Sequence, residues 1–201
     1  MIEVAYVHEF STLNGGERSF LNLLSMLDRE RFSPLVLAPA SSSIEECELA
    51  YDVQKLGVEI IDFNIRQDGR RGVFEEVAER AAAILQKRET RIVHGNSLSV
   101  GEYSGFIASR IQGRKVAALS HVRDIQKLKK NRVLRLKQNH GLIAVSHATQ
   151  EHLISQGLPA DLLNVIWNGI DPGFANQQAA ASELWPGDDG SAPVVACIGQ
   201  I

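Results

Sequence analysis

The chain alternates between short apolar runs and longer segments in which apolar residues recur every three or four positions. The short runs are nearly continuous in Val, Ile, Leu and Ala, which is typical of strands buried on both faces of a parallel sheet. They predict strands over 2–8, 34–38, 58–63, 92–94, 115–122, 142–146 and 164–167. The intervening segments predict helices over 19–27, 44–56, 73–85, 99–111 and 148–156, with a strongly basic helix after residue 122. This order favours an α/β fold with a doubly wound, Rossmann-like parallel sheet.

Two of these helices are expected to pack in different ways. The first carries a large apolar stripe at helical spacing, Phe20, Leu23, Leu24 and Leu27. The helix over 99–111 instead carries small residues at that spacing, Gly101, Ser104, Gly105 and Ala108. We expect the large stripe to cover a sheet and the small one to permit a close approach to a neighbouring element.

Polar side chains gather where the predicted strands end. His8, His94, His121 and His147 lie at or just beyond such carboxyl ends, and Asn96, Ser97, Arg123, Asp124 and Ser146 accompany them. In doubly wound sheets ligands bind at this edge, so these residues are expected to form one polar rim. For any single histidine, a loop residue with a satisfied hydrogen bond is the alternative.

The turn after the first strand reads Asn14-Gly15-Gly16-Glu17-Arg18. Adjacent glycines can adopt positive φ and let a ligand approach the backbone, and the free N–H groups of the following helix attract anions. Gly15 and Gly16 are therefore candidates for binding a phosphate. The alternative is a tight strand-to-helix turn that merely requires glycine.

A basic segment follows the fifth predicted strand. It consists of Lys127, Lys129, Lys130, Arg132, Arg135 and Lys137, with no acidic residue between 125 and 140. Interspersed leucines and a valine supply apolar area, so the segment could contact an anionic membrane peripherally. A solvated basic helix face is the alternative.

Composition narrows the functional classes. The 201 residues carry a net charge of −3, which favours no nucleic-acid partner, and 44% are apolar, as in ordinary globular proteins. No apolar run is long enough for a membrane span and no signal peptide is apparent, so a cytoplasmic location is expected, with the membrane contact on its inner face. The two cysteines, Cys47 and Cys197, lack metal-ligand spacing, and Asp188-Asp189 lies in a glycine-flanked stretch. We predict no metal and no cofactor.

The end of the chain differs from the rest. Residues 175–192 lack periodicity and are expected to be a linker, whereas 193–198 again resemble a buried strand. The predicted organisation is a domain over 1–174, the linker 175–192, and the start of a truncated second domain over 193–201.

Several motifs together carry a family resemblance. They are Gly15-Gly16-Glu17-Arg18, Leu21-Asn22-Leu23-Leu24, Ile92-Val93-His94, Ser120-His121, Ile143-Ala144-Val145-Ser146 and Val165-Ile166-Trp167-Asn168-Gly169-Ile170-Asp171. In this order they resemble the amino-terminal half of family-four retaining glycosyltransferases of the GT-B fold. The match spans about residues 1–201.

The resemblance implies a function for each position. In such enzymes the first domain binds mainly the acceptor, a glycan or lipid-linked molecule, and the second binds the nucleotide-sugar donor. Gly15 and Gly16 would then meet the donor diphosphate, and His121 would lie near the transferred sugar as the catalytic candidate. The expected acceptor side comprises Arg18, His94, Asn96, Ser97, Arg123 and Ser146. On this basis the chain alone should be inactive.

The sequence also departs from the family pattern. Many members continue from histidine directly to aspartate, whereas Val122 and Arg123 separate His121 from Asp124 here, and Gln200 stands where many members have arginine. A non-catalytic sugar-nucleotide-binding or regulatory module with the same fold is the alternative function. Nicotinamide binding and Ser-His-Asp hydrolysis are disfavoured, since neither Gly-x-Gly-x-x-Gly nor Gly-x-Ser-x-Gly occurs.

Overall fold

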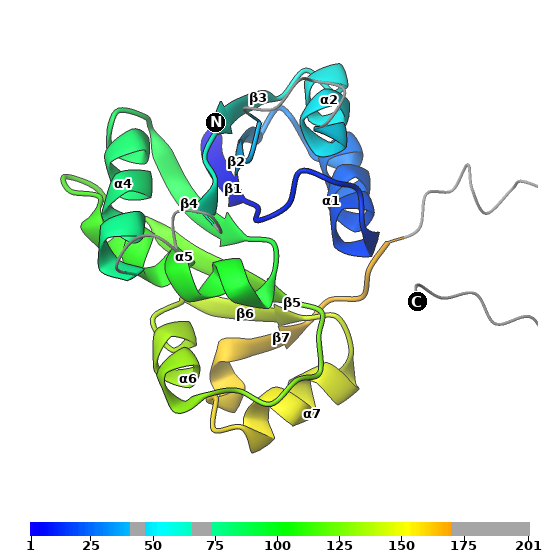
Figure 1. Ribbon diagram of the computed structural model, residues 1–201, viewed down its shortest axis with the longest axis vertical. Helices are drawn as coiled ribbons and strands as arrows, with labels where there is room; N and C mark the ends of the chain where they lie inside the picture. Colours follow the sequence, from blue (N-terminus) through cyan, green and yellow to red (C-terminus); the bar gives the residue numbers. More distant parts are fainter. Residues whose placement is uncertain (41–46, 66–73, 170–201) are drawn as a thin grey trace, which may run out of the picture. The chain divides into compact units, whose positions relative to one another are not determined.

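Seven strands form one parallel sheet in the computed structural model, which describes residues 1–40, 47–65 and 74–169 (Figure 1). Their order across the sheet is β3-β2-β1-β4-β5-β6-β7, and every neighbouring pair is parallel. The strands are β1 Ile2–Val7, β2 Phe32–Ala38, β3 Glu59–Asp62, β4 Thr90–Gly95, β5 Ala117–Val122, β6 Gly141–Ala144 and β7 Leu163–Val165. The predicted doubly wound sheet is therefore confirmed.

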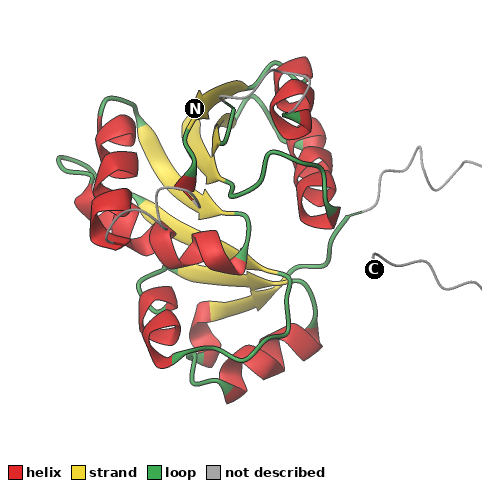
Figure 2. Cartoon of the chain, viewed as in Figure 1, coloured by secondary structure: helices red, strands yellow, loops and turns green. Residues whose placement is uncertain are grey.

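Helices cover both faces of the sheet (Figure 2). They are α1 Gly15–Met26, α2 Glu48–Lys55, α4 Phe74–Gln86, α5 Leu98–Arg110, α6 Lys130–Leu136 and α7 His147–Ser155. Helices α1 and α2 share one apolar core with β1 and β2, whereas α4 and α5 pack on the opposite face. A third core lies beneath α6 and α7. The carboxyl-terminal parts of β1 and β2 can thus be apolar and buried, because helices cover both faces of the sheet there.

Helix α1 differs from its prediction at both its start and its apolar face. It begins at Gly15 rather than near residue 19, because Asn14 precedes the first turn and its N–H donates to the Glu17 carboxylate at 3.2 Å. Phe20 and Leu24 are fully buried, but Leu23 is 43% exposed and lies outside the packed face. The predicted stripe of four leucine and phenylalanine positions was therefore too wide.

Other boundaries shift as well. The basic segment is not one long helix, since the chain from 123 to 129 is irregular and only Lys130–Leu136 is helical. The predicted start of the second helix at residue 44, the 66–72 loop, the 175–192 linker and the 193–198 strand all lie outside the described residues. Among the described residues, no helix is both long and apolar enough to cross a bilayer.

The small-residue face of α5 is used as predicted. A Cβ added to Gly101 would lie 2.5 Å from the Ser120 Cβ on β5, and one added to Gly105 would lie 2.6 Å from backbone atoms of Gln138. These distances are far shorter than a van der Waals contact, so α5 can approach β5 and the end of α6 only because side chains are absent there. The carboxamide of Asn139 seals this junction by donating to the Gly101 carbonyl at 2.9 Å.

We expect Gly105→Ala to lower the free energy of unfolding by about 1–3 kcal/mol, because the Gln138 backbone must move to admit the methyl group. Gly15→Ala is the matched control, since nothing lies within 4 Å of its added Cβ. It should change stability by less than about 0.5 kcal/mol. Urea unfolding of both variants tests this, and equal effects would contradict the packing argument.

Candidate functional site

The candidate site lies where the chain order of the sheet reverses. Strand β1 is flanked by β2 on one side and by β4 on the other, so the connections leave in opposite directions from the β1–β4 pair. His8 follows β1, while His94 and Asn96 lie at the end of β4. The crevice at such a switch point is the usual ligand site in open α/β sheets. Three of the predicted rim residues are thereby brought together.

Arg123 connects the ends of β4 and β5. Its guanidinium donates to the backbone carbonyl of Asn96 and, at 3.0 Å, to the Asn96 side-chain oxygen. The same group donates to His121 Nδ1 at 3.2 Å. These bonds fix the orientation of the Asn96 amide, whose nitrogen then faces the Gly16 carbonyl at 3.3 Å and His8 Nδ1 at 3.4 Å.

The network determines where the histidine protons lie. Guanidinium and amide nitrogens can only donate, so Nδ1 of His121 and Nδ1 of His8 must accept. In a neutral imidazole the proton then lies on Nε2. Both rings therefore present an Nε2–H donor, and His121 cannot act as a general base through that atom.

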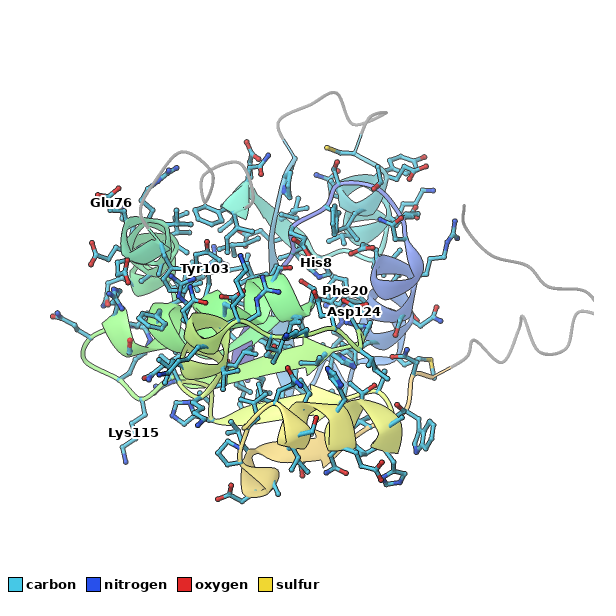
Figure 3. The ribbon with its side chains drawn as sticks, turned by 60° about the horizontal axis from the view of Figure 1, so that its bottom comes forward. His8, Phe20, Glu76, Tyr103, Lys115 and Asp124 are labelled. Carbon is cyan, nitrogen blue, oxygen red and sulfur yellow. The ribbon has the colours of Figure 1, made fainter. Side chains whose placement is uncertain are left out.

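Burial keeps these histidines neutral. Desolvation first, and then the Arg123 charge and His94, lower the pKa of His8 and of His121 to about 3. Desolvation and Arg123 lower the pKa of His94 to about 4. The ring of His94 stacks on that of His121, with 5.9 Å between the ring centroids. The ring of His8 packs on that of Phe20, with 4.1 Å between the centroids (Figure 3).

Several buried donors at this edge have no partner among the described residues. They are Nε2 of His8, Nε2 of His121 and Nε of Arg123, and Nε2 of His94 is also unpartnered. A buried donor without an acceptor costs about 1–3 kcal/mol, and such groups in native structures commonly mark functional sites. The site is therefore rich in donors, which suits the oxygen atoms of a phosphate or a sugar.

The start of α1 adds further donors. The first hydrogen bond in the helix runs from the Arg18 N–H to the Asn14 carbonyl, so the N–H groups of Gly15 and Gly16 have no acceptor within the helix. Neither glycine has positive φ, contrary to our expectation, because both belong to the helix. What glycine provides here is access: a Cβ on Gly15 would contact nothing, and one on Gly16 would reach only Arg123, at 3.7 Å.

The remaining predicted residues occupy other positions. Ser97 caps α5 and donates to the Glu9 carboxylate at 2.9 Å, at the border of the cluster. Ser146 caps α7, and His147 contacts Trp167, so the structure does not bring either into the histidine cluster. Arg18 is exposed on α1 and makes no side-chain hydrogen bond or ion pair with the described residues. The expected single rim is thus smaller than predicted.

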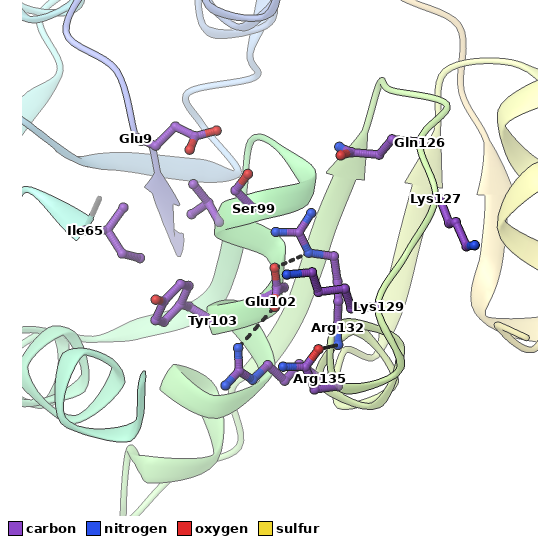
Figure 4. Close-up of a pocket in the computed structure, with 12 residues that line it drawn as sticks. Glu9, Ile65, Ser99, Glu102, Tyr103, Gln126, Lys127, Lys129, Arg132 and Arg135 are labelled. Carbon is purple, nitrogen blue, oxygen red and sulfur yellow. Dashed lines mark hydrogen bonds and ion pairs between the residues drawn. The ribbon is translucent and has the colours of Figure 1, made fainter. Parts of the chain in front are cut away.

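A cavity of about 490 Å³ lies beyond Ser97 on this edge (Figure 4). It is lined by Glu9, Ile65, Ser99, Val100, Glu102, Tyr103, Gln126, Lys127, Lys129, Asn131, Arg132 and Arg135. Sequence analysis missed Glu9 and Glu102. The position of Glu9 directly after a strand-end histidine could have indicated it, but nothing local distinguishes Glu102 from an exposed helix residue.

The positive charge of the basic segment is partly neutralised by a carboxylate in the lining of this cavity. Arg132 and Arg135 form ion pairs with Glu102, which is only 5% exposed. The apparent absence of acidic residues was therefore misleading, because the counter-charge comes from α5. No group of three His, Cys, Asp or Glu side chains suited to a metal occurs in the described ranges.

Comparison with known proteins identifies the family. The sequence model described as Glycosyltransferase Family 4 matches residues 13–174, which is most of the chain. The chain belongs to Glycosyltransferase Family 4. No curated protein matches the chain in sequence.

Solved structures share the fold of this family-4 chain at low identity. HepE from Anabaena in complex with UDP-glucose is 15% identical with a TM-score of 0.69, covering 92% of this chain and 49% of its own. A glycosyltransferase from Rickettsia africae is 18% identical with a TM-score of 0.69, covering 91% and 48%. The lipopolysaccharide outer core galactosyltransferase WaaB is 13% identical with a TM-score of 0.62, covering 84% and 46%. The chain spans about half the length of these structures and has the Rossmann-like fold of one GT-B half.

Acidification should destabilise the protein. The unfolded chain takes up protons on His8, His94 and His121 near pH 6.5, whereas the folded chain does so only near pH 3 to 4. Their contribution is therefore fully present above about pH 6.5 and falls by up to about 1.4 kcal/mol per pH unit per histidine as the pH drops toward 4. Urea unfolding at pH 7.5 and 5.5 measures this. His121→Gln should reduce the pH dependence, and an unchanged slope would contradict it.

Gly16→Val should impair ligand binding more than folding. Valine has a helix propensity no worse than that of glycine, and a Cβ meets Arg123 at an ordinary contact distance. The branched side chain would nevertheless cover the free N–H groups at the start of α1. We expect a nearly unchanged melting temperature and at least an approximately tenfold loss of affinity for a diphosphate, measured with inorganic pyrophosphate. If the melting temperature and the affinity fell together, Gly16 would have only a structural role in the turn.

Proposed function

We propose that the full-length protein is a retaining glycosyltransferase that transfers a sugar from a nucleotide-sugar donor to a glycan or lipid-linked acceptor. Family membership supports transferase chemistry, and HepE, which shares the fold, is recorded with UDP-glucose. The observation that carries the proposal is the set of unpartnered N–H donors at the sheet's switch point, beside the free N–H groups of Gly15 and Gly16. Donors of this kind are complementary to diphosphate and sugar oxygens.

Each part of the site has a proposed role. The start of α1 contributes about half a positive charge, which stabilises the donor diphosphate. His121, neutral and protonated on Nε2, donates a hydrogen bond to the transferred sugar and so positions it. Arg123 holds His121 and Asn96 in their orientations and contributes its charge to the acceptor side. In this scheme, residues 1–174 form the acceptor-side domain and the second domain supplies most donor contacts, so residues 1–201 alone do not transfer sugar.

The test is sugar transfer by the full-length protein from labelled UDP-sugars to extracted glycans and lipids, with the anomeric configuration of the product determined by NMR. His121→Ala should lower turnover about tenfold, as expected for the loss of one hydrogen bond that positions the transferred sugar. His147→Ala is the control, because His147 lies outside the cluster. Full turnover by His121→Ala, or by residues 1–201 alone, would overturn these roles. Nucleotide-sugar binding without turnover would favour the non-catalytic module.

A further inference from the structure

One arginine in the lining of the 490 Å³ cavity, Arg132, is held by an ion pair that occupies only part of its guanidinium. Nε of Arg132 pairs with Oε1 of the buried Glu102, so the two terminal amino groups remain available. Within the described ranges, these groups donate no hydrogen bond. Figure 4 draws the ion pair between Arg132 and Glu102 as a dashed line among the residues that line the cavity.

A second arginine, Arg135, balances the negative charge of Glu102. Arg135 donates to Oε2 of Glu102 at 3.3 Å and its guanidinium lies 3.6 Å from the centre of the Phe74 ring. Phe74 in turn stacks on Tyr103 at 4.1 Å. Arg135 is therefore held by packing and by its ion pair, and it balances the Glu102 carboxylate. The charge of Arg132 is then in excess.

Lysine side chains add to this excess. Lys127 and Lys129 line the cavity with the two arginines, against the carboxylates of Glu9 and Glu102, which leaves four cations and two anions in the lining. Glu9 is at the Ser97 side and accepts the Ser97 hydroxyl. The cavity thus has an acidic side next to the histidine cluster and a basic side formed by Lys129 and Arg132.

We propose that this basic side binds a phosphate group of the acceptor, an inference that rests on the proposed function. The free fork of Arg132 matches two phosphate oxygens, and the Lys129 ammonium supplies a point charge to the same group. Glu102 is a positioning residue, because it aims the fork without touching the ligand. The acceptor is thus a phosphorylated molecule, and its sugar hydroxyls lie toward Glu9 and the histidines.

The alternative is a basic face that contacts an anionic membrane without a defined site. That role would fall on the most exposed cations, and Lys130 and Lys137 are exposed on or beside α6 but outside the cavity lining. They share the segment, the charge and the exposure needed for nonspecific attraction. They therefore provide a matched control.

The test uses the full-length protein saturated with UDP, to occupy the donor site, and titrated with inorganic pyrophosphate in a calorimeter. Lys129→Gln/Arg132→Gln should weaken pyrophosphate binding at least about tenfold, as expected for the loss of charge-assisted bonds. Lys130→Gln/Lys137→Gln removes the same charge and should change it less than about twofold. Equal weakening by both, or no weakening by the first, would overturn the proposal.

A second set of variants guards against misfolding. Lys129→Gln leaves the Glu102 ion pairs untouched, and Arg132→Lys retains a cation near Glu102 but removes the fork. Each should weaken binding several-fold with a melting temperature close to that of the wild type, and unchanged affinity in both would contradict the site.

The source of the phosphate is resolved in the same way. Binding of a soluble hexose phosphate, or of vesicles containing an isoprenyl diphosphate, is compared across the two double variants. If Lys129→Gln/Arg132→Gln loses binding of one of these ligands and Lys130→Gln/Lys137→Gln does not, the site is supported. The ligand whose binding is lost then identifies the source of the phosphate. If neither ligand shows this loss, the proposal is overturned. Selective pyrophosphate binding without any sugar transfer would refute the proposed function while leaving the phosphate site intact.

Discussion

The hydrogen bonds of Arg123 determine the polarity of the candidate site. This guanidinium joins the Asn96 carbonyl, the Asn96 amide and His121, and so connects the ends of two adjacent strands. Because a guanidinium only donates, each neighbour turns an acceptor toward it and a donor away from it. Burial lowers the pKa of Arg123, while the carboxylates of Glu17 and Asp124 oppose that shift and favour its charged form. One cation therefore orders the protons of two histidines.

A similar arrangement recurs at the cavity. Buried acceptors hold the guanidinium in both places: the Asn96 oxygens for Arg123, and the Glu102 carboxylate for Arg132. Orienting an arginine in this way before a ligand arrives reduces the entropy lost on binding. Ser97, which follows Asn96 in the chain, donates to Glu9, and Glu9 lines the same cavity as Arg132. An acceptor that carries both sugar and phosphate would contact both arginines.

The sequence predicted the sheet and part of the site. Strand runs were recognisable because both faces are buried, and the strand-end residues His8, His94, Asn96 and His121 follow from chain order alone. The start of α1 was misplaced because two glycines disfavour a helix, and here the capping of Asn14 by Glu17 outweighs that preference. Glu102 could not be found locally, since its partners come from a segment about thirty residues later. Long-range ion pairs leave no periodicity in the sequence.

The unpartnered donors at the candidate site affect how strongly that site can bind a ligand. Nε2 of His121, Nε2 of His8 and Nε of Arg123 lack acceptors among the described residues, and each such group costs about 1–3 kcal/mol in the free protein. A ligand oxygen that accepts from one of them removes that cost, in addition to forming a bond. Under the proposed function, a sugar diphosphate carries several oxygens, so one ligand could accept hydrogen bonds from more than one of these nitrogens.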